Sequence, residues 1–330
     1  MIITLWVLVF IVSLVVLVKG ADMFLDSSEK IGLSMGISPF VIGVTLVAAG
    51  TSFPELISSI VAIIKHTPEL VVANAVGSNI ANIFLIVGIV ALFARKIVVQ
   101  KDLMDLDLPL LVISMLLLVG VSYDGIVTVP EAVLLCINYI LYILYVMSEK
   151  RSEVEAIVEP ALESNPEDKQ WIRRAMFGWL PRISVRDTVF LVAGGAMLAL
   201  GANYLVESVI ALSAILNIGV AMISISAVAI GTSLPELFVS IRASMKGKPE
   251  IAIGNIFGSN IFNTFVVVGV PGLFARLPVD SATLSLGIPA LIVATLIFVI
   301  SGSSKTIYVW EGAGYVSLYV LFIAKLFNLF

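Results

Sequence analysis

The chain alternates long apolar runs with short polar segments, and this pattern predicts its secondary structure. Ten runs are long enough to cross a hydrocarbon core as α-helices, which takes about 17–25 residues. Two of them are longer than a span needs and contain Pro54 and Pro235, which predicts kinked or partly unwound helices. The runs lie at 2–19, 36–64, 69–93, 107–123, 127–148, 185–205, 210–243, 249–274, 284–302 and 312–329.

Composition supports this all-α membrane fold. Of the 330 residues, 60% are hydrophobic and 13% are charged, with a mean hydropathy of +1.11. Soluble domains carry about 25% charged residues, so the chain is an integral membrane protein. The net charge of −4 gives no reason to expect a nucleic-acid partner. The single cysteine, Cys136, excludes a disulfide framework or a cysteine-based metal site.

The distribution of Lys and Arg predicts the orientation in the cell membrane. If the N-terminus is outside, 16 of the 19 basic residues lie in the inner loops, and only Lys65, Arg276 and Lys325 lie outside. Loops rich in Lys and Arg stay in the cytoplasm. We therefore expect both termini outside and the hydrophilic segment 149–184 in the cytoplasm.

That segment divides the chain into three parts. Residues 1–148 form a first five-helix unit, 149–184 a cytoplasmic linker, and 185–330 a second five-helix unit. The linker begins with a Glu-rich solvated stretch, and its mixed aromatic and basic residues 171–180 predict a short helix at the membrane surface. It is too short for a regulatory domain of ordinary size.

The two units are copies of each other. The run Gly-Thr-Ser-x-Pro-Glu occurs at 50–55 and 231–236, and the run Gly-Ser-Asn-Ile-x-Asn occurs at 77–82 and 258–263. All matched positions are 181 residues apart. Because each copy has an odd number of spans, the second copy must enter the membrane from the opposite side. Inverted repeats are common in transporters, whose substrate sites lie near the membrane midplane where interrupted helices meet.

The first motif places an oxygen-rich face at membrane depth. On a helix, Ala48, Thr51, Ser52 and Glu55 follow one another at i, i+3, i+4 and i+7, so they share a face. Pro54 lacks an N–H and should leave one or more carbonyls near 48–50 without helical partners. The second copy supplies Ala229, Thr232, Ser233 and Glu236.

The second motif adds polar groups on the next span of each copy. Ser78 and Asn82 are i, i+4 neighbours, and Ser259 and Asn263 repeat them. Asn74 and Asn255 extend the same stripe by one turn. We expect Asn74 and Asn255 to form hydrogen bonds with loosened backbone and not to bind an ion.

These groups are chemically suited to a hard cation. Calcium takes 6–8 oxygen ligands, whereas zinc, copper and iron prefer nitrogen or sulfur. Two ionised glutamates would be neutralised by one divalent ion, and without it a carboxylate in the bilayer is costly. The only histidine, His66, lies in a predicted loop, and the spans hold no evident nucleophile–base pair. We therefore predict ion transport without a cofactor, and not an enzyme; a passive cation channel is the alternative of another class.

The two motifs, in two copies and in this order, resemble the α-repeats of the calcium/cation antiporter superfamily, above all prokaryotic sodium/calcium exchangers. The resemblance covers nearly the whole chain. It implies ten helices in two inverted five-helix halves, and Na⁺/Ca²⁺ antiport by alternating access. Ca²⁺ and Na⁺ would be the transported ligands, with membrane lipid as surroundings and no protein partner evident.

The resemblance also implies a set of ion ligands. Glu55 and Glu236 would bridge the ion sites, and Asn82 and Asn263 would add amide oxygens. The remaining ligands would be the backbone carbonyls of Ala48 and Ala229 and the hydroxyls of Thr51, Thr232, Ser52, Ser233, Ser78 and Ser259.

Two departures from other branches of the superfamily bear on the coupling ion. The proton/calcium branch typically has Gly-Asn-x-x-Glu where this chain has Thr-Ser-x-Pro-Glu, which favours sodium coupling and leaves proton/calcium exchange as the alternative. The potassium-dependent branch carries Asp at the position of Asn263. The amide there argues against potassium coupling.

Overall fold

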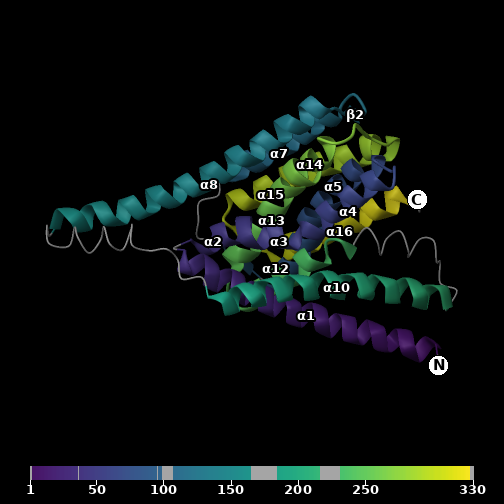
Figure 1. Cartoon of the computed structure of the whole chain (residues 1–330), viewed down its shortest axis with the longest axis horizontal. Coiled ribbons are helices and arrows are strands. Elements are labelled where there is room, and N and C mark those ends of the chain that lie inside the picture. Colours follow the sequence, from purple (N-terminus) through teal and green to yellow (C-terminus); the bar gives the residue numbers. More distant parts are fainter. Residues whose placement is uncertain are drawn as a thin grey trace.

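The computed structural model is a bundle of helices, as the apolar pattern predicts (Figure 1). It describes residues 2–35, 37–94, 96–98, 107–164, 184–215 and 231–327. Among these residues, eight helical stretches are long and apolar enough to cross a membrane, and α7 (Asp107–Ser122) is a shorter apolar helix. The expected surface helix 171–180 and residues 216–230 of the expected seventh span lie outside the described residues.

Several spans are built from consecutive short helices. The first copy comprises α1 (Ile2–Ser34), α2 (Pro39–Ile42), η1 (Gly43–Val47), α3 (Ala48–Thr51), α4 (Phe53–Ile64), α5 (Glu69–Ile80), η2 (Ala81–Val87), α6 (Gly88–Ala94), β1 (Lys96–Val98), α7, β2 (Ile126–Val127) and α8 (Val129–Ser164). The η segments are π-helical turns, which are wider than α-helical ones and frequent at functional sites. Helix α8 continues through the first part of the expected linker.

The second copy follows the same plan. It comprises α10 (Val185–Ile215), α12 (Leu234–Met245), α13 (Pro249–Phe262), η3 (Asn263–Val267), α14 (Gly269–Gly272), β3 (Leu277–Pro278), η4 (Thr283–Gly287), α15 (Ile288–Ser303), β4 (Thr306–Tyr308) and α16 (Val309–Leu326). The π-helical turns η2 and η3 occupy matched positions in the two copies and both contain the last Asn of the second motif.

The prediction that the first span ends at residue 19 is wrong, because α1 continues to Ser34. Its second half carries three acidic residues about one turn apart, so they share a face. They form ion pairs with basic residues in the last turn of α12 and between α12 and α13, and these pairs allow the helix to continue through a charged segment. The pairs are Asp22–Arg242 at 2.7 Å, Asp26–Lys246 at 2.6 Å, and Glu29–Lys248.

The two strand pairings join the copies, and they involve matched positions. Strand β1 pairs antiparallel with β4 through Ile97 and Ile307, and β2 pairs antiparallel with β3 through Ile126 and Pro278. A shift of 181 residues converts one pairing into the other. A two-fold relation between the copies accounts for this pattern.

The helices α1 and α10, which begin the two copies, pack against each other in opposite directions (Figure 1). Gly201 of α10 lies against Leu17, whereas Gly194, earlier in α10, lies against Phe24, later in α1. Matched helices that run antiparallel are what copies of opposite membrane orientation require.

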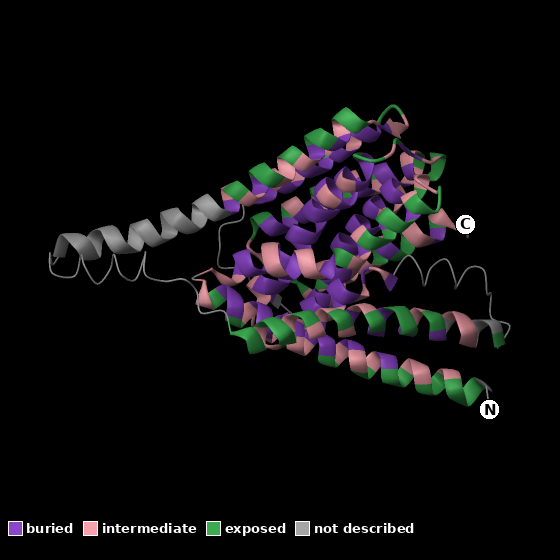
Figure 2. Ribbon diagram, in the orientation of Figure 1, coloured by how far each residue is buried: buried purple, intermediate pink, exposed green. Residues whose placement is uncertain are grey.

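The core lies between the α1–α10 pair and the helices α7 and α8, as Figure 2 shows by the concentration of buried residues there. Helix α13 is buried from Ile251 to Phe262. Glycines let the backbone of α2 and η1 cross it closely: a methyl group on Gly254 would lie 2.5 Å from the Phe40 carbonyl oxygen. A methyl group on Gly258 would overlap the Val44 carbonyl oxygen. Small residues commonly permit such crossings between membrane helices.

We expect Gly258→Ala to lower the midpoint of thermal unfolding in detergent, because the added methyl group would force α13 and η1 apart. Overpacking of this kind costs about 1–3 kcal/mol. Gly314→Ala is the matched control, since a methyl group there meets no atom within 4 Å. Equal midpoints for the two variants would contradict the close crossing.

Candidate cation-binding site

Each copy carries its glutamate in the first turn of a helix that follows a break. Helix α3 ends at Thr51, and Ser52, with φ −86° and ψ 5°, interrupts the helical path before α4. Ser233 adopts φ −89° and ψ 4° before α12 in the same way. Pro54 and Pro235 occupy the first turns, where a missing N–H costs no hydrogen bond. Glu55 and Glu236 therefore lie at helix N-termini, whose free N–H groups favour negative charge.

The structure brings the first motifs of the two copies together. The Ser52 hydroxyl of the first copy donates a hydrogen bond of 2.8 Å to Glu236 Oε1 of the second. The Thr51 hydroxyl lies 3.1 Å from Asn255 Oδ1, again across the copies. Thr232 of the second copy faces the Glu55 carboxylate of the first. Each carboxylate is thus approached by hydroxyls of the other copy.

The second motif contributes from the neighbouring helices. Ser78 lies on α5 and Ser259 on α13, whereas Asn82 and Asn263 lie where η2 and η3 begin. Helices α4 and α12 contact α5 and α13 respectively, and α13 contacts both α5 and η2. The predicted residues therefore come from helices that pack around one centre.

Many polar atoms of these residues are buried without a hydrogen-bond partner. Glu55 and Ser259 are fully buried, and Glu236 is 1% exposed. A buried polar atom without a partner costs about 1–3 kcal/mol, so a cluster of them indicates a site that binds a ligand. Within the described residues, the unpartnered atoms include both Glu55 oxygens, Glu236 Oε2, the hydroxyls of Ser78, Ser233 and Ser259, both amide atoms of Asn82, and Asn263 Oδ1.

The donor set fits a hard cation. Among the described residues there is no group of three or more His, Cys, Asp and Glu side chains that could hold a metal. The cluster instead offers two carboxylates and several neutral oxygens. Calcium and sodium bind through oxygen alone, and calcium tolerates irregular geometry.

Ala48, a predicted backbone ligand, has a carbonyl oxygen that is already hydrogen-bonded. This oxygen accepts a hydrogen bond of 3.0 Å from the Ser52 N–H, and the Thr51 hydroxyl lies 3.3 Å away. The physical reason is that the helix breaks after Thr51, so the turn that contains Ala48 stays helical. Ala229, its counterpart, lies outside the described residues.

Asn74 and Asn255 support the backbone, as predicted. Asn74 Nδ2 lies 3.4 Å from the Glu55 carbonyl oxygen, and Asn255 Nδ2 lies 3.5 Å from that of Glu236. Each also contacts a serine one turn beyond the glutamate, at 3.4 Å for Ser59 and 3.0 Å for Ser240. These serines are not among the predicted site residues, although their 181-residue separation is a signal in the sequence that identifies them.

The third residue of the second motif was also missed. Asn79 Nδ2 lies 3.3 Å from the Asn260 carbonyl oxygen and 3.2 Å from Thr264 Oγ1, and Asn263 Nδ2 lies 3.1 Å from Asn79 Oδ1. Asn79 and Asn260 are matched positions, each 2% exposed. Their presence in the repeated run was a signal, but their partners could not be deduced from one sequence.

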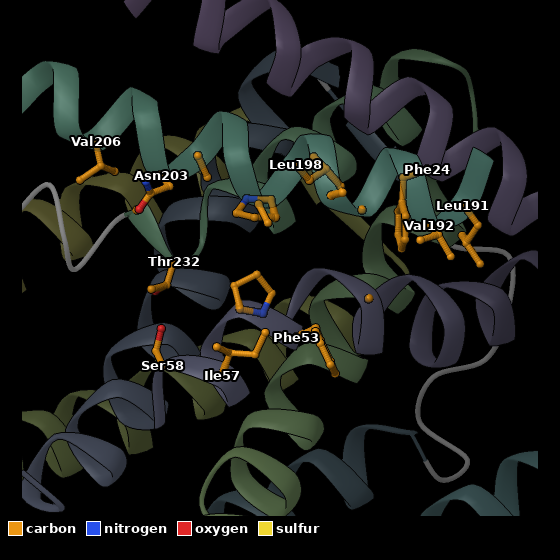
Figure 3. Close-up of a pocket in the computed structure, with 18 residues that line it drawn as sticks. Phe24, Phe53, Ile57, Ser58, Leu191, Val192, Leu198, Asn203, Val206 and Thr232 are labelled. Carbon is orange, nitrogen blue, oxygen red and sulfur yellow. The ribbon is translucent and has the colours of Figure 1, made fainter. Parts of the chain in front are cut away.

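A cavity of about 780 Å³ lies beside the cluster, between α10 and the helices of the first motif. Leu198, Asn203 and Val206 of α10 line one wall, while Phe53 and Ile57 of α4 line the other (Figure 3). Thr232, Pro54 and Pro235 also line it, so the cavity reaches the motifs. Its lining is mostly apolar.

Comparison with known proteins agrees with the chemistry of this cluster. The family described as "Sodium/calcium exchanger protein" matches residues 5–148 and 187–328. The chain is 35% identical to the sodium/calcium exchanger MaX1 of Methanosarcina acetivorans, over 97% of this chain and 98% of that protein. It is 32% identical to the inner membrane protein YrbG of Escherichia coli, over 87% of this chain and 86% of that protein.

A solved structure gives the same answer. The sodium-calcium exchanger NCX_Mj, soaked with Na⁺ and Sr²⁺, superposes with a TM-score of 0.76 at 28% identity. The match covers 98% of this chain and 99% of that one. The two matched regions of the family correspond to the two copies that carry Glu55 and Glu236. The chain belongs to the sodium/calcium exchanger protein family and is a prokaryotic-type member of the calcium/cation antiporter superfamily.

Proposed function

We propose that this protein exchanges Na⁺ for Ca²⁺ across the membrane at a single cluster built around Glu55 and Glu236. The observation that carries the proposal is the pair of buried carboxylates, one from each copy, whose remaining oxygens have no hydrogen-bond partner. Family membership supports a calcium exchanger. The choice of sodium over protons rests on the Thr-Ser-x-Pro-Glu form of the motif.

The proposed ligands are the two carboxylates, the amide oxygens of Asn82 and Asn263, and neighbouring hydroxyls. Ser78, Ser233 and Ser259 have hydroxyls free to bind an ion, and Thr232 faces Glu55. Thr51 and Ser52 would exchange their present hydrogen bonds for an ion. Ala48 is the weakest candidate because its carbonyl oxygen is already bonded, and Ala229 remains a candidate by repetition alone.

Charge balance couples the two ions. One Ca²⁺ or at least two Na⁺ would neutralise the two glutamates, so the loaded site could cross the membrane interior at low electrostatic cost. An empty site carrying two charges would not reorient. Ca²⁺ and Na⁺ would therefore compete for overlapping positions, and uncoupled leakage would be suppressed.

The same proposal includes the membrane arrangement. We propose two inverted five-helix halves with the linker in the cytoplasm and both termini outside. The antiparallel packing of α1 and α10 and the exchange of strand pairings between the copies support inversion. The start of α1 and the end of α16 lie at the same end of the bundle in Figure 1.

For alternating access, we propose that the α1–α10 pair moves against the remaining helices. The two helices contact each other through Gly20, Gly194 and Gly201, so they can move as one body. The apolar cavity between α10 and α4 leaves space on the side that faces the cluster. A shift of this helix pair would then be enough to open the loaded site to one side of the membrane or to the other.

We expect purified protein in proteoliposomes loaded with Na⁺ to take up Ca²⁺ when the outward Na⁺ gradient is imposed. The driving force is the sodium gradient, because the same carboxylates carry both ions. The measurement is Ca²⁺ uptake with a fluorescent indicator or radioactive calcium, with equal external and internal Na⁺ as the control.

The possible outcomes separate the functions. Uptake that follows a pH gradient and ignores the sodium gradient would replace this proposal with proton/calcium exchange. Calcium flux without any counter-ion requirement would indicate a channel.

We expect Glu236→Gln and Glu55→Gln each to reduce exchange at least about a hundredfold. The amide keeps the shape of the side chain but halves the charge that neutralises Ca²⁺, and removing one member of a buried charge set costs about 3–5 kcal/mol. Sodium-driven uptake and calorimetric Ca²⁺ binding are the measurements. Glu69→Gln, in the first turn of α5, is the matched control and should retain wild-type exchange. Full exchange in either site variant would refute the assignment of the site.

A further inference from the structure

The amide of Asn263 is held in one orientation by a chain of hydrogen bonds. Asn79 Nδ2 donates to the Asn260 backbone carbonyl at 3.3 Å and to Thr264 Oγ1 at 3.2 Å. Asn263 Nδ2 in turn donates to Asn79 Oδ1 at 3.1 Å. All four residues are at most 2% exposed, so water does not compete for these bonds.

Chemistry determines which group donates and which accepts in this series of hydrogen bonds. A backbone carbonyl can only accept a hydrogen bond, so the side of Asn79 that faces Asn260 must be its NH₂ group. Asn79 Oδ1 then points to Asn263, which must supply the donor. Asn263 Oδ1 is thereby turned away from Asn79, and it is buried without a partner. An ionised carboxylate at position 263 would have no hydrogen to donate to Asn79, which accounts for the amide there.

The matched position in the first copy has no such hydrogen-bond acceptor. The position matched to Thr264 is Ile83, which has no hydroxyl to accept a hydrogen bond. Asn260, matched to Asn79, donates instead to the Ile256 carbonyl of its own helix at 2.7 Å. Both amide atoms of Asn82, the counterpart of Asn263, are buried without a hydrogen-bond partner in the described part of the chain. One hydroxyl thus distinguishes the two copies at this layer.

We propose that Thr264 and Asn79 are positioning residues that hold Asn263 Oδ1 toward the transported cation, whereas Asn82 is an adjustable ligand. The inference rests on the proposed function, since it assigns Asn263 as a ligand of the same site. A ligand held in place before the ion arrives adds affinity because its ordering cost is already met. Without the Thr264 acceptor, Asn79 loses one of the two hydrogen bonds that orient it and keeps the one to the Asn260 carbonyl. The Asn79 and Asn263 amides are then held less firmly, and the Asn263 amide presents its NH₂ group to the cation in a larger share of molecules.

The test compares Thr264→Val, Thr264→Ser and Thr295→Val. Thr264→Val keeps the shape but removes the hydroxyl, and we expect it to raise the Ca²⁺ concentration for half-maximal exchange about five- to tenfold, the equivalent of one buried hydrogen bond. The maximal rate should change less than twofold. Thr264→Ser restores the acceptor and should retain near-wild-type affinity.

Thr295→Val is the matched control. Thr295 is also a buried threonine in a membrane helix, but its hydroxyl donates to the Leu291 carbonyl oxygen of its own helix, at 2.9 Å. Its loss should leave both the half-maximal Ca²⁺ concentration and the maximal rate of exchange unchanged. A general effect of losing a buried hydroxyl would appear in both valine variants.

Two results would overturn the inference: a Thr264→Val variant with wild-type Ca²⁺ affinity, or one that lowers only the maximal rate. If Thr264→Val does not fold, as judged by its thermal unfolding, Thr264→Ala and Thr264→Ser provide the same comparison of hydroxyl absent and present. Calorimetric Ca²⁺ binding, measured alongside, separates this inference from the proposed function. Wild-type protein that binds Ca²⁺ without sodium-driven uptake would refute the exchange but leave the comparison of affinities valid.

Discussion

The fold depends on the burial of two carboxylates in a protein surrounded by hydrocarbon. An isolated ionised carboxylate in such surroundings costs several kcal/mol or more, and this chain buries Glu55 and Glu236 with no Lys or Arg in contact with either among the described residues. The compensation comes from neutral dipoles: helix N-termini, the Ser52 hydroxyl and the N–H groups around each break. Dipoles lower the cost without neutralising the charge, so the site retains its attraction for a cation.

Duplication explains how the chain can stabilise two buried carboxylates close to each other. Each carboxylate is approached by a hydroxyl from the helix break of the other copy, as Glu236 is by Ser52 and Glu55 by Thr232. The asparagines one helix away then support the backbone of the glutamates from the same copy, as Asn74 and Asn255 do. Contacts within a copy shape each helix break, and contacts between copies assemble the site.

The sequence predicted most of this arrangement because the motif repeats at a constant separation and its polar residues share helix faces. It failed where tertiary contacts override local signals. The charges after residue 19 suggested a loop, but Arg242 and Lys246 pair with Asp22 and Asp26 and let α1 continue. The hydrogen bond from Ser52 to Glu236 joins residues of the two copies, and no local pattern predicts such a partner.

Under the proposed exchange, a site that binds two ions of different charge in turn would benefit from copies that are not identical. Strict two-fold symmetry would give Asn82 and Asn263 the same freedom, and each would have to pay an ordering cost for every ion. The difference between Ile83 and Thr264 removes that equivalence, since Thr264 has a hydroxyl that accepts from the asparagine of the other copy and Ile83 has none. In the proposed site, the Asn263 amide oxygen would keep a fixed position, and the Asn82 amide would move to match an ion's size and coordination. The repeat would then build the site, and the local difference between the copies would adapt it to two ions.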